Sequence, residues 1–159
     1  YNGLQTATYQ TVGAPNTYAD FTSIPSWVKR ITVMLDGVST NGTSIPIIQL
    51  GDSGGVETSA YSSVGSRIAT ATAASTKVTN GFGIGSVGTA TGTLYGSVTI
   101  TLIGFRTWVA SGVVADETNG YSLLCSGGKS LSRTLDRVRI TTVNGTDQFD
   151  AGSVNIIYE

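Results

Sequence analysis

The sequence of 159 residues contains no histidine, and this absence excludes much of the usual side-chain chemistry. Histidine is the side chain that most readily exchanges a proton near neutral pH. Ser-His-Asp and Cys-His catalysis and histidine-ligated metal sites are therefore excluded. The string Gly51-Asp52-Ser53-Gly54-Gly55 matches the sequence around the nucleophile of serine proteases. Because Ser53 has no imidazole base, we interpret this string as a glycine-rich turn after a strand.

Cysteine, charge and long apolar runs are also scarce. The single Cys125 can form no internal disulfide, and we expect it to be a small buried side chain. Charged residues make up 12% of the chain, with nine Lys and Arg against ten Asp and Glu, so nucleic acid is not an expected partner. No apolar run approaches the roughly 20 residues that span a bilayer, so we expect no membrane insertion. The chain begins YNGLQ, without an initiator Met or a signal pattern, and we expect it to be a piece of a longer chain.

Small polar residues are abundant instead: the chain has 24 Thr, 18 Ser and 21 Gly. Apolar and polar residues alternate with period two in several short runs, which is the pattern of strands with one buried face. The clearest predicted strands lie at 27–35, 97–104, 135–143 and 153–159, and weaker ones at 6–12, 44–50, 107–114 and 121–126. No run shows the apolar stripe of an amphipathic helix.

Turn signals separate these predicted strands at short intervals. Five pairs tolerate the positive φ of a tight turn: Asp36-Gly37, Asn41-Gly42, Asn80-Gly81, Asn119-Gly120 and Asn144-Gly145. Many short strands with frequent turns are typical of antiparallel sandwiches and barrels. We predict an all-β fold, an antiparallel two-sheet β-sandwich of jelly-roll-like form with about eight to ten strands and essentially no helix. Residues 1–159 are expected to form a single domain.

The segment 62–93 differs from the rest because it is mostly Ser, Thr, Ala and Gly. We predict flat strands and long loops within the domain here, with weakly specified register. Gly83, Gly85 and Gly88 fit the G-x-G-x-x-G spacing of dinucleotide-binding proteins. No helical pattern follows Gly88 and the next carboxylate is Asp116, so the motif is interpreted as a glycine-rich loop.

Carboxylates and aromatic residues near turns are the remaining candidates for a site. Paired carboxylates could support glycoside hydrolysis, or several oxygens could hold Ca²⁺, but Asp near a turn more often caps backbone amides. Exposed aromatic faces stack on sugar rings, and Trp108 and Tyr121 flank the sequence 116–120. Burial in the core is the competing interpretation for Trp108, and it is favoured for Trp27. The candidate ligand-binding residues are Asp52, Glu57, Tyr61, Trp108, Asp116, Glu117, Asn119 and Tyr121, with no catalytic residue, metal ligand or cofactor expected.

Three blocks of the sequence, at 24–44, 48–63 and 135–159, resemble the C-terminal module of tail fibre and related tail proteins of tailed bacteriophages. The likeness is strongest over the last 25 residues, and the three blocks together span roughly two-fifths of the chain. The segment 62–93 carries little of it. The resemblance assigns no binding residue.

This resemblance implies a homotrimeric, β-rich fibre tip of an extracellular virion. Such a tip would act as a non-catalytic adhesin for a bacterial surface glycan, either lipopolysaccharide or capsule, with weak single sites strengthened by avidity. We expect the contact to lie on the loops at 52–61 and 116–121. Two alternatives stay open: a capping and trimerisation domain that touches no receptor, and a glycan-degrading component.

Overall fold

The computed structural model describes residues 3–159, and within them the chain forms fourteen β-strands and no helix. The large sheet contains β1 (Gln5–Thr6), β2 (Gln10–Thr11), β4 (Arg30–Thr40), β7 (Ser62–Ile68), β8 (Ala73–Val78), β10 (Leu94–Gly104), β11 (Thr107–Asp116), β12 (Tyr121–Ser130) and β14 (Phe149–Tyr158). The small sheet contains β3 (Ala19–Phe21), β5 (Pro46–Asp52), β6 (Gly55–Val56), β9 (Phe82–Gly83) and β13 (Leu135–Thr142). The predicted all-β, two-sheet antiparallel sandwich is confirmed.

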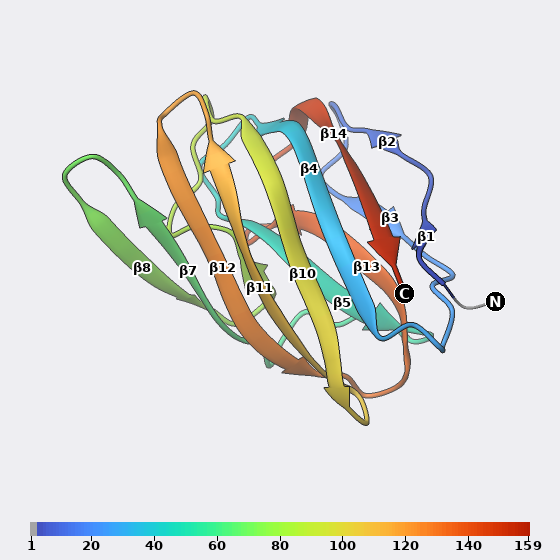
Figure 1. The fold of residues 1–159 in the computed structure, drawn as a ribbon. Helices are drawn as coiled ribbons and strands as arrows, with labels where there is room; N and C mark the ends of the chain where they lie inside the picture. The colour runs from blue at the N-terminus through green and yellow to red at the C-terminus, as the bar shows by residue number, and fades with distance from the viewer. Residues whose placement is uncertain (1–2) are drawn as a thin grey trace.

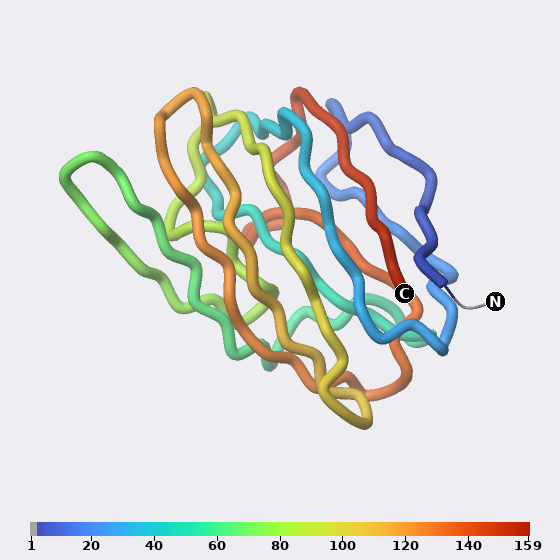
Figure 2. Tube along the Cα trace, viewed as in Figure 1, coloured from blue at the N-terminus to red at the C-terminus, as the bar shows by residue number. Residues whose placement is uncertain are grey.

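The two sheets lie face to face and differ in size (Figure 1). In the large sheet, β10, β11 and β12 form a meander, β4 lies between β14 and β10, and β7 joins the free side of β12. The hairpin of β7 and β8 extends from one side of the body as an arm (Figure 2). Nine strands have six or more residues, and the others are short edge segments of two or three. Because nine strands face only five, the outer face of the large sheet is the widest open surface of the fold.

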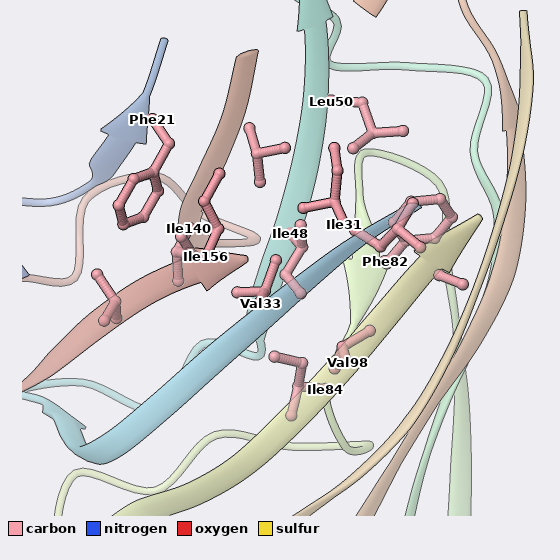
Figure 3. Packing of buried hydrophobic residues seen from close by; sticks show 14 of the residues in the cluster. Phe21, Ile31, Val33, Ile48, Leu50, Phe82, Ile84, Val98, Ile140 and Ile156 are labelled. Atoms are coloured by element: carbon pink, nitrogen blue, oxygen red, sulfur yellow. The ribbon is translucent and has the colours of Figure 1, made fainter. Parts of the chain in front are cut away.

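The core lies between the sheets and is built by the predicted alternation. Ile31 and Val33 of β4 and Val98 and Ile100 of β10 point inward from the large sheet and are almost fully buried. They meet Ile48, Leu50, Val138 and Ile140 of the small sheet, together with Phe82, in one cluster (Figure 3). Each large apolar side chain buried in this way stabilises the fold by about 1.5–3 kcal/mol.

Two of the five predicted tight turns are confirmed, and one prediction is corrected. Asn119-Gly120 and Asn144-Gly145 lie in tight turns, and Gly120 and Gly145 have φ of +67° and +68°. Asp36-Gly37 is not a turn, because β4 continues to Thr40. Gly37 has φ of +65° at a place where the pairing of β4 with both neighbours shifts register. Its positive φ serves a bulge, which can bend a strand without ending it.

The segment 62–93 forms strands and loops within the domain, as predicted, and its glycines allow close packing. It supplies β7, β8, β9 and a glycine-rich loop that crosses the inner face of β7. A Cβ atom on Gly65 would lie only 1.9 Å from the carbonyl oxygen of Gly85. The backbone of β7 fixes the position of this Cβ, and the oxygen belongs to the backbone of the loop. Neither atom can therefore move aside without shifting the strand or the loop. Gly65 is therefore required by the packing of this loop on β7.

We predict that Gly65→Ala destabilises the protein by about 1–3 kcal/mol, the usual cost of overpacking. Gly13→Ala is the matched control, because a Cβ there would meet nothing within 4 Å. The free energy of unfolding in urea should fall for the first variant and stay near the wild-type value for the second. Equal stability of the two variants would contradict the packing described here.

Candidate functional site

A row of polar side chains crosses the outer face of the small sheet. In the strand register, Arg139 of β13 lies opposite Asp20 of β3 on one side and Gln49 of β5 on the other. Their neighbours along each strand, such as Val138 and Ile140, are buried in the core. Because side chains alternate between the faces of a sheet, all three polar residues point away from the core.

Arg139 is held in a fixed position by two partners. Its Nε and Nη2 donate to the two carboxylate oxygens of Asp20 at 2.7 and 2.8 Å, which is a bidentate ion pair. The guanidinium carbon lies 3.9 Å from the centroid of the Tyr18 ring, a stacked cation–π contact. Hydrogen bonds to Asp20 raise the pKa of Arg139 above its ordinary value. The pair is charge-neutral as a unit, and it orients the ring of Tyr18, which is 49% exposed.

This row forms the floor of a shallow hollow of about 220 Å³. Gln49 donates from Nε2 to the carbonyl oxygen of Asn80 at 2.8 Å, and Asn80 donates from Nδ2 to the carbonyl oxygen of Val143 at 2.9 Å. These bonds fix two amide groups at the wall of the hollow. The remaining lining residues are Thr58, Thr141, Thr142, Val143, Asn144 and Gly145.

The chemistry of the hollow suits an uncharged polar ligand. It is lined by one aromatic ring, three amide side chains and the hydroxyls of three threonines, with its single cation already matched by a carboxylate. Aromatic faces accept the C–H faces of sugar rings, while fixed amides and hydroxyls bond sugar hydroxyls. We call this site the hollow on the small sheet, and its main side chains are Tyr18, Gln49, Asn80 and Arg139.

The predicted loop 52–61 is a structural brace, and only Thr58 of it lines the hollow. Asp52 is 4% exposed and accepts hydrogen bonds from the backbone amides of Gly54 and Arg133 at 2.7 and 3.1 Å. Ser53 and Gly54 form the turn between β5 and β6, as the turn interpretation of this string predicted. These contacts tie the loop to the segment that follows β12.

Glu57 and Tyr61 complete this brace around the buried Lys129. Glu57 accepts from Lys129 Nζ at 2.6 Å and from the Ser132 amide at 2.7 Å. Burial alone would raise the pKa of Glu57, but hydrogen bonds from Lys129 and Ser132 lower it to about 2. The Tyr61 hydroxyl, held by backbone groups of Leu50 and Glu57, is buried, and this burial raises its pKa. The polar groups of Glu57, Tyr61 and Lys129 are therefore used in contacts within the fold.

The second predicted loop, 116–121, is a fastened turn at the other end of the sandwich (Figure 1). Asp116 is 2% exposed and accepts from Thr89 Oγ1 and Asn119 Nδ2, both at 2.9 Å. Glu117 is exposed, and Tyr121 lies half-buried under the guanidinium of Arg67 at 4.8 Å from the ring centroid. The carboxylate of Asp116 and the side-chain amide of Asn119 therefore close the turn.

The expectation that Trp108 offers an exposed face to a sugar is wrong. Trp108 is 3% exposed and belongs to the core, which was the competing interpretation. It also lies at the start of β11, opposite Lys129, whereas Asp116 lies at the far end of the same strand. Cys125 is buried as predicted, which raises the pKa of its thiol to about 12. Trp27 packs against the core beside Tyr158, with 6.0 Å between ring centroids.

The predicted residues thus separate into two groups at opposite ends of the sandwich. Asp52, Glu57, Tyr61 and Trp108 lie toward one end, and Asp116, Glu117, Asn119 and Tyr121 toward the other. In residues 3–159, no three His, Cys, Asp or Glu side chains gather in a way that could hold a metal ion. The hollow on the small sheet contains none of the eight predicted residues.

Sequence reasoning missed the hollow because its residues come from distant segments. Asp20 and Arg139 are 119 positions apart, and Tyr18 precedes a strand of only three residues. The alternation in 135–143 did place Arg139 on the wet face of a strand. Its partners depend on which strands lie beside it, and a single sequence does not reveal that pairing.

The ion pair of Glu57 with Lys129 predicts a distinct pH dependence of stability. The pKa of Glu57 is lowered from 4.5 to about 2, so its stabilisation is complete above about pH 4.5 and is lost as pH falls through 2. Near neutral pH, Glu57→Gln should cost about 3 kcal/mol because it leaves the buried Lys129 without its partner charge. The stability difference between wild type and variant, measured by urea unfolding from pH 7 to pH 2, should shrink below pH 4.5.

Exposed Glu117→Gln is the control for this measurement, and its stability should differ little from wild type at every pH. A Glu57→Gln curve that stays parallel to wild type down to pH 2 would show that the ion pair does not stabilise the fold.

Similarity to known proteins does not supply a function for this fold. The chain matches no protein-family model, no curated protein and no solved structure at a significant level. Residues 3–159 form no helix long and apolar enough to cross a membrane. The surfaces of the sandwich and the resemblance of the blocks at 24–44, 48–63 and 135–159 are the features that bear on function.

Proposed function

We propose that this chain is the tip domain of a bacteriophage tail fibre and that it attaches the virion to a bacterial surface glycan without cleaving it. The observation that carries the proposal is the hollow on the small sheet, where Tyr18 is oriented by Arg139 among fixed amides and hydroxyls. The tail-fibre resemblance at 135–159 includes β13, the strand that bears Arg139. The low charge of the chain suits a ligand rich in hydroxyl groups.

The engagement of the carboxylates supports binding without bond cleavage. A pair of acids that hydrolyses a glycoside must reach the scissile bond with both carboxyl groups. Asp52, Glu57 and Asp116 each accept hydrogen bonds from side chains or backbone amides of the fold. Asp20 is occupied by Arg139. The four acids hold the structure together, and the hollow binds its ligand through uncharged groups and a neutral ion pair.

The proposed glycan contact is tested by removing the aromatic ring. Tyr18→Ala should abolish most binding to host lipopolysaccharide or capsule on a glycan array, because the stacking surface is lost while the sheet is retained. Gln49→Ala should weaken binding as well, through the loss of a fixed amide. The matched control is Tyr9→Ala, which removes a tyrosine with an exposed fraction of 59% from the segment between β1 and β2, outside both the hollow and the strands of the trimer face. Unchanged binding by Tyr18→Ala, or absence of glycan binding by the wild type, would contradict this site.

We also propose that the outer face of the large sheet joins copies of the chain into a homotrimer. Three rows of side chains cross β10, β11, β12 and β7 on this face, and one of them runs from Ser97 through Val113 and Leu124 to Ser66. The other two rows are Tyr95, Ala115, Ser122, Ile68 and Thr99, Ser111, Ser126, Val64. None of these twelve residues is charged, and Val113 is 60% exposed. Covering a surface without charges avoids the cost of desolvating ions, and its hydroxyls can bond to one another across the contact.

A mass measurement tests this face. The wild-type chain should show the mass of a trimer by light scattering, and Val113→Glu should show the mass of a monomer, because three carboxylates would be buried together. A control variant, Thr22→Glu, adds the same charge at an exposed residue outside the large sheet and should stay trimeric. A monomeric wild type, or a trimer that survives Val113→Glu, would exclude this face.

A further inference from the structure

The tip of the hairpin between β10 and β11 carries an aromatic side chain that the fold does not explain. Phe105 is 86% exposed, and Ile103 beside it is 66% exposed. Phe105 also has φ of +50°, a left-handed conformation that strains the backbone of a non-glycine residue. A glycine at this position would relieve the backbone and remove apolar surface from water. We name residues 103–106 the hairpin tip (Figure 1).

Cations without an ion-pair partner lie on the segments beside the hairpin tip. Arg106 lies over the Phe105 ring, 4.3 Å from its centroid, and donates to the carbonyl oxygen of Ser132. Arg133 follows Ser132 and is exposed. On the other side of the hairpin, the carbonyl oxygen of the exposed Lys29 accepts from the Leu102 amide at 2.8 Å. Among residues 3–159, the ion pairs take up Arg30, Lys129, Arg137 and Arg139, and none involves Lys29, Arg106 or Arg133.

The carboxylates at this end of the sandwich do not offset Lys29 and Arg106. Glu57 and Asp136 are paired with Lys129 and Arg137, and Glu159 with Arg30. Asp52 is buried and faces backbone amides, and its Oδ1 and Arg133 Nη1 each lie 3.1 Å from the position that a Cβ on Gly54 would take, so this carboxylate is close to Arg133. Each of the three ion pairs cancels its own charge, which leaves Arg106 over the exposed aromatic ring, and Lys29 on the neighbouring segment, as cations without an ion-pair partner.

We infer that the hairpin tip is a second binding site, separate from the hollow, and that it takes a polysaccharide bearing phosphate or carboxylate groups. Phe105 packs on the sugar ring, and Arg106 and Lys29 bind the anionic substituents. Hydroxyls border the tip, with Thr107 and Ser130 bonded to each other at 2.8 Å. A polysaccharide fits better than a bilayer, because Ile103 and Phe105 are the only exposed large apolar side chains at the tip and hydroxyls surround them.

The inference is tested with dextran phosphate as the probe, neutral dextran as its uncharged counterpart, and anionic phosphatidylglycerol vesicles. The wild-type chain should bind dextran phosphate, bind neutral dextran and vesicles at least about tenfold more weakly, and release dextran phosphate in high salt. Phe105→Gly should weaken binding about fivefold while its melting temperature stays the same or rises. Arg106→Ala should weaken binding by a similar factor.

Two controls distinguish this site from general attraction of a polyanion and from the hollow. Lys77→Ala removes an unpaired cation from β8, away from the hairpin tip, and should leave binding of dextran phosphate unchanged. Tyr18→Ala should also leave it unchanged, since the hollow is a different site. Equal binding by wild type and Phe105→Gly, equal losses in Arg106→Ala and Lys77→Ala, or stronger binding to the vesicles would each overturn the inference.

Discussion

The unequal size of the two sheets is the constraint on which the other features of this protein depend. Burial between facing sheets supplies the main stabilisation of a sandwich, and only the area that both sheets cover becomes core. Here nine strands face five, so large apolar residues concentrate under β4, β10, β5 and β13. Beyond that area the large sheet continues as β7 and β8, where Ser, Thr, Ala and Gly replace the large residues. The composition of β7 and β8 thus reflects their position outside the main core, whereas Phe82 and Ile84 of the same segment are buried in it.

The same constraint explains why charged side chains point inward at the ends of the sandwich. Lys129 and Asp116 occupy inward positions of β12 and β11, at opposite ends, where the apolar layer stops. An unpaired charge there would cost several kcal/mol, and each is matched by polar groups from a neighbouring loop. Lys129 meets Glu57 and the carbonyl oxygen of Ser59, while Asp116 meets Thr89 and Asn119. The loops are thereby fixed by the charges that close the core.

The sequence predicts features that depend on neighbouring residues in the chain, such as the strands and their buried faces. It does not predict features that depend on which strands lie side by side. Alternation with period two located the strands and their buried faces, because burial of Ile31 or Val138 requires nothing beyond the pleat. The same parity would have placed Trp108 with Ala110 and Val114 on the buried face, so that error was avoidable. The pairing of Arg139 with Asp20 was not predictable, since it depends on β3 lying beside β13. The separation of Asp20 and Arg139 along the sequence does not indicate that their strands are neighbours.

Charge on the surface of this sandwich is distributed in a way that separates its proposed contacts. The outer face of the large sheet carries uncharged rows, which favour contact with an identical uncharged face. On the small sheet, Asp20 neutralises Arg139 in place, so the hollow discriminates by shape and hydrogen bonds. At the hairpin tip, unpaired cations lie beside Phe105, and attraction there extends over about a Debye length, roughly 8 Å at physiological salt. A glycan with charged and neutral segments would therefore meet the tip first and the hollow afterwards, because only the tip acts at a distance.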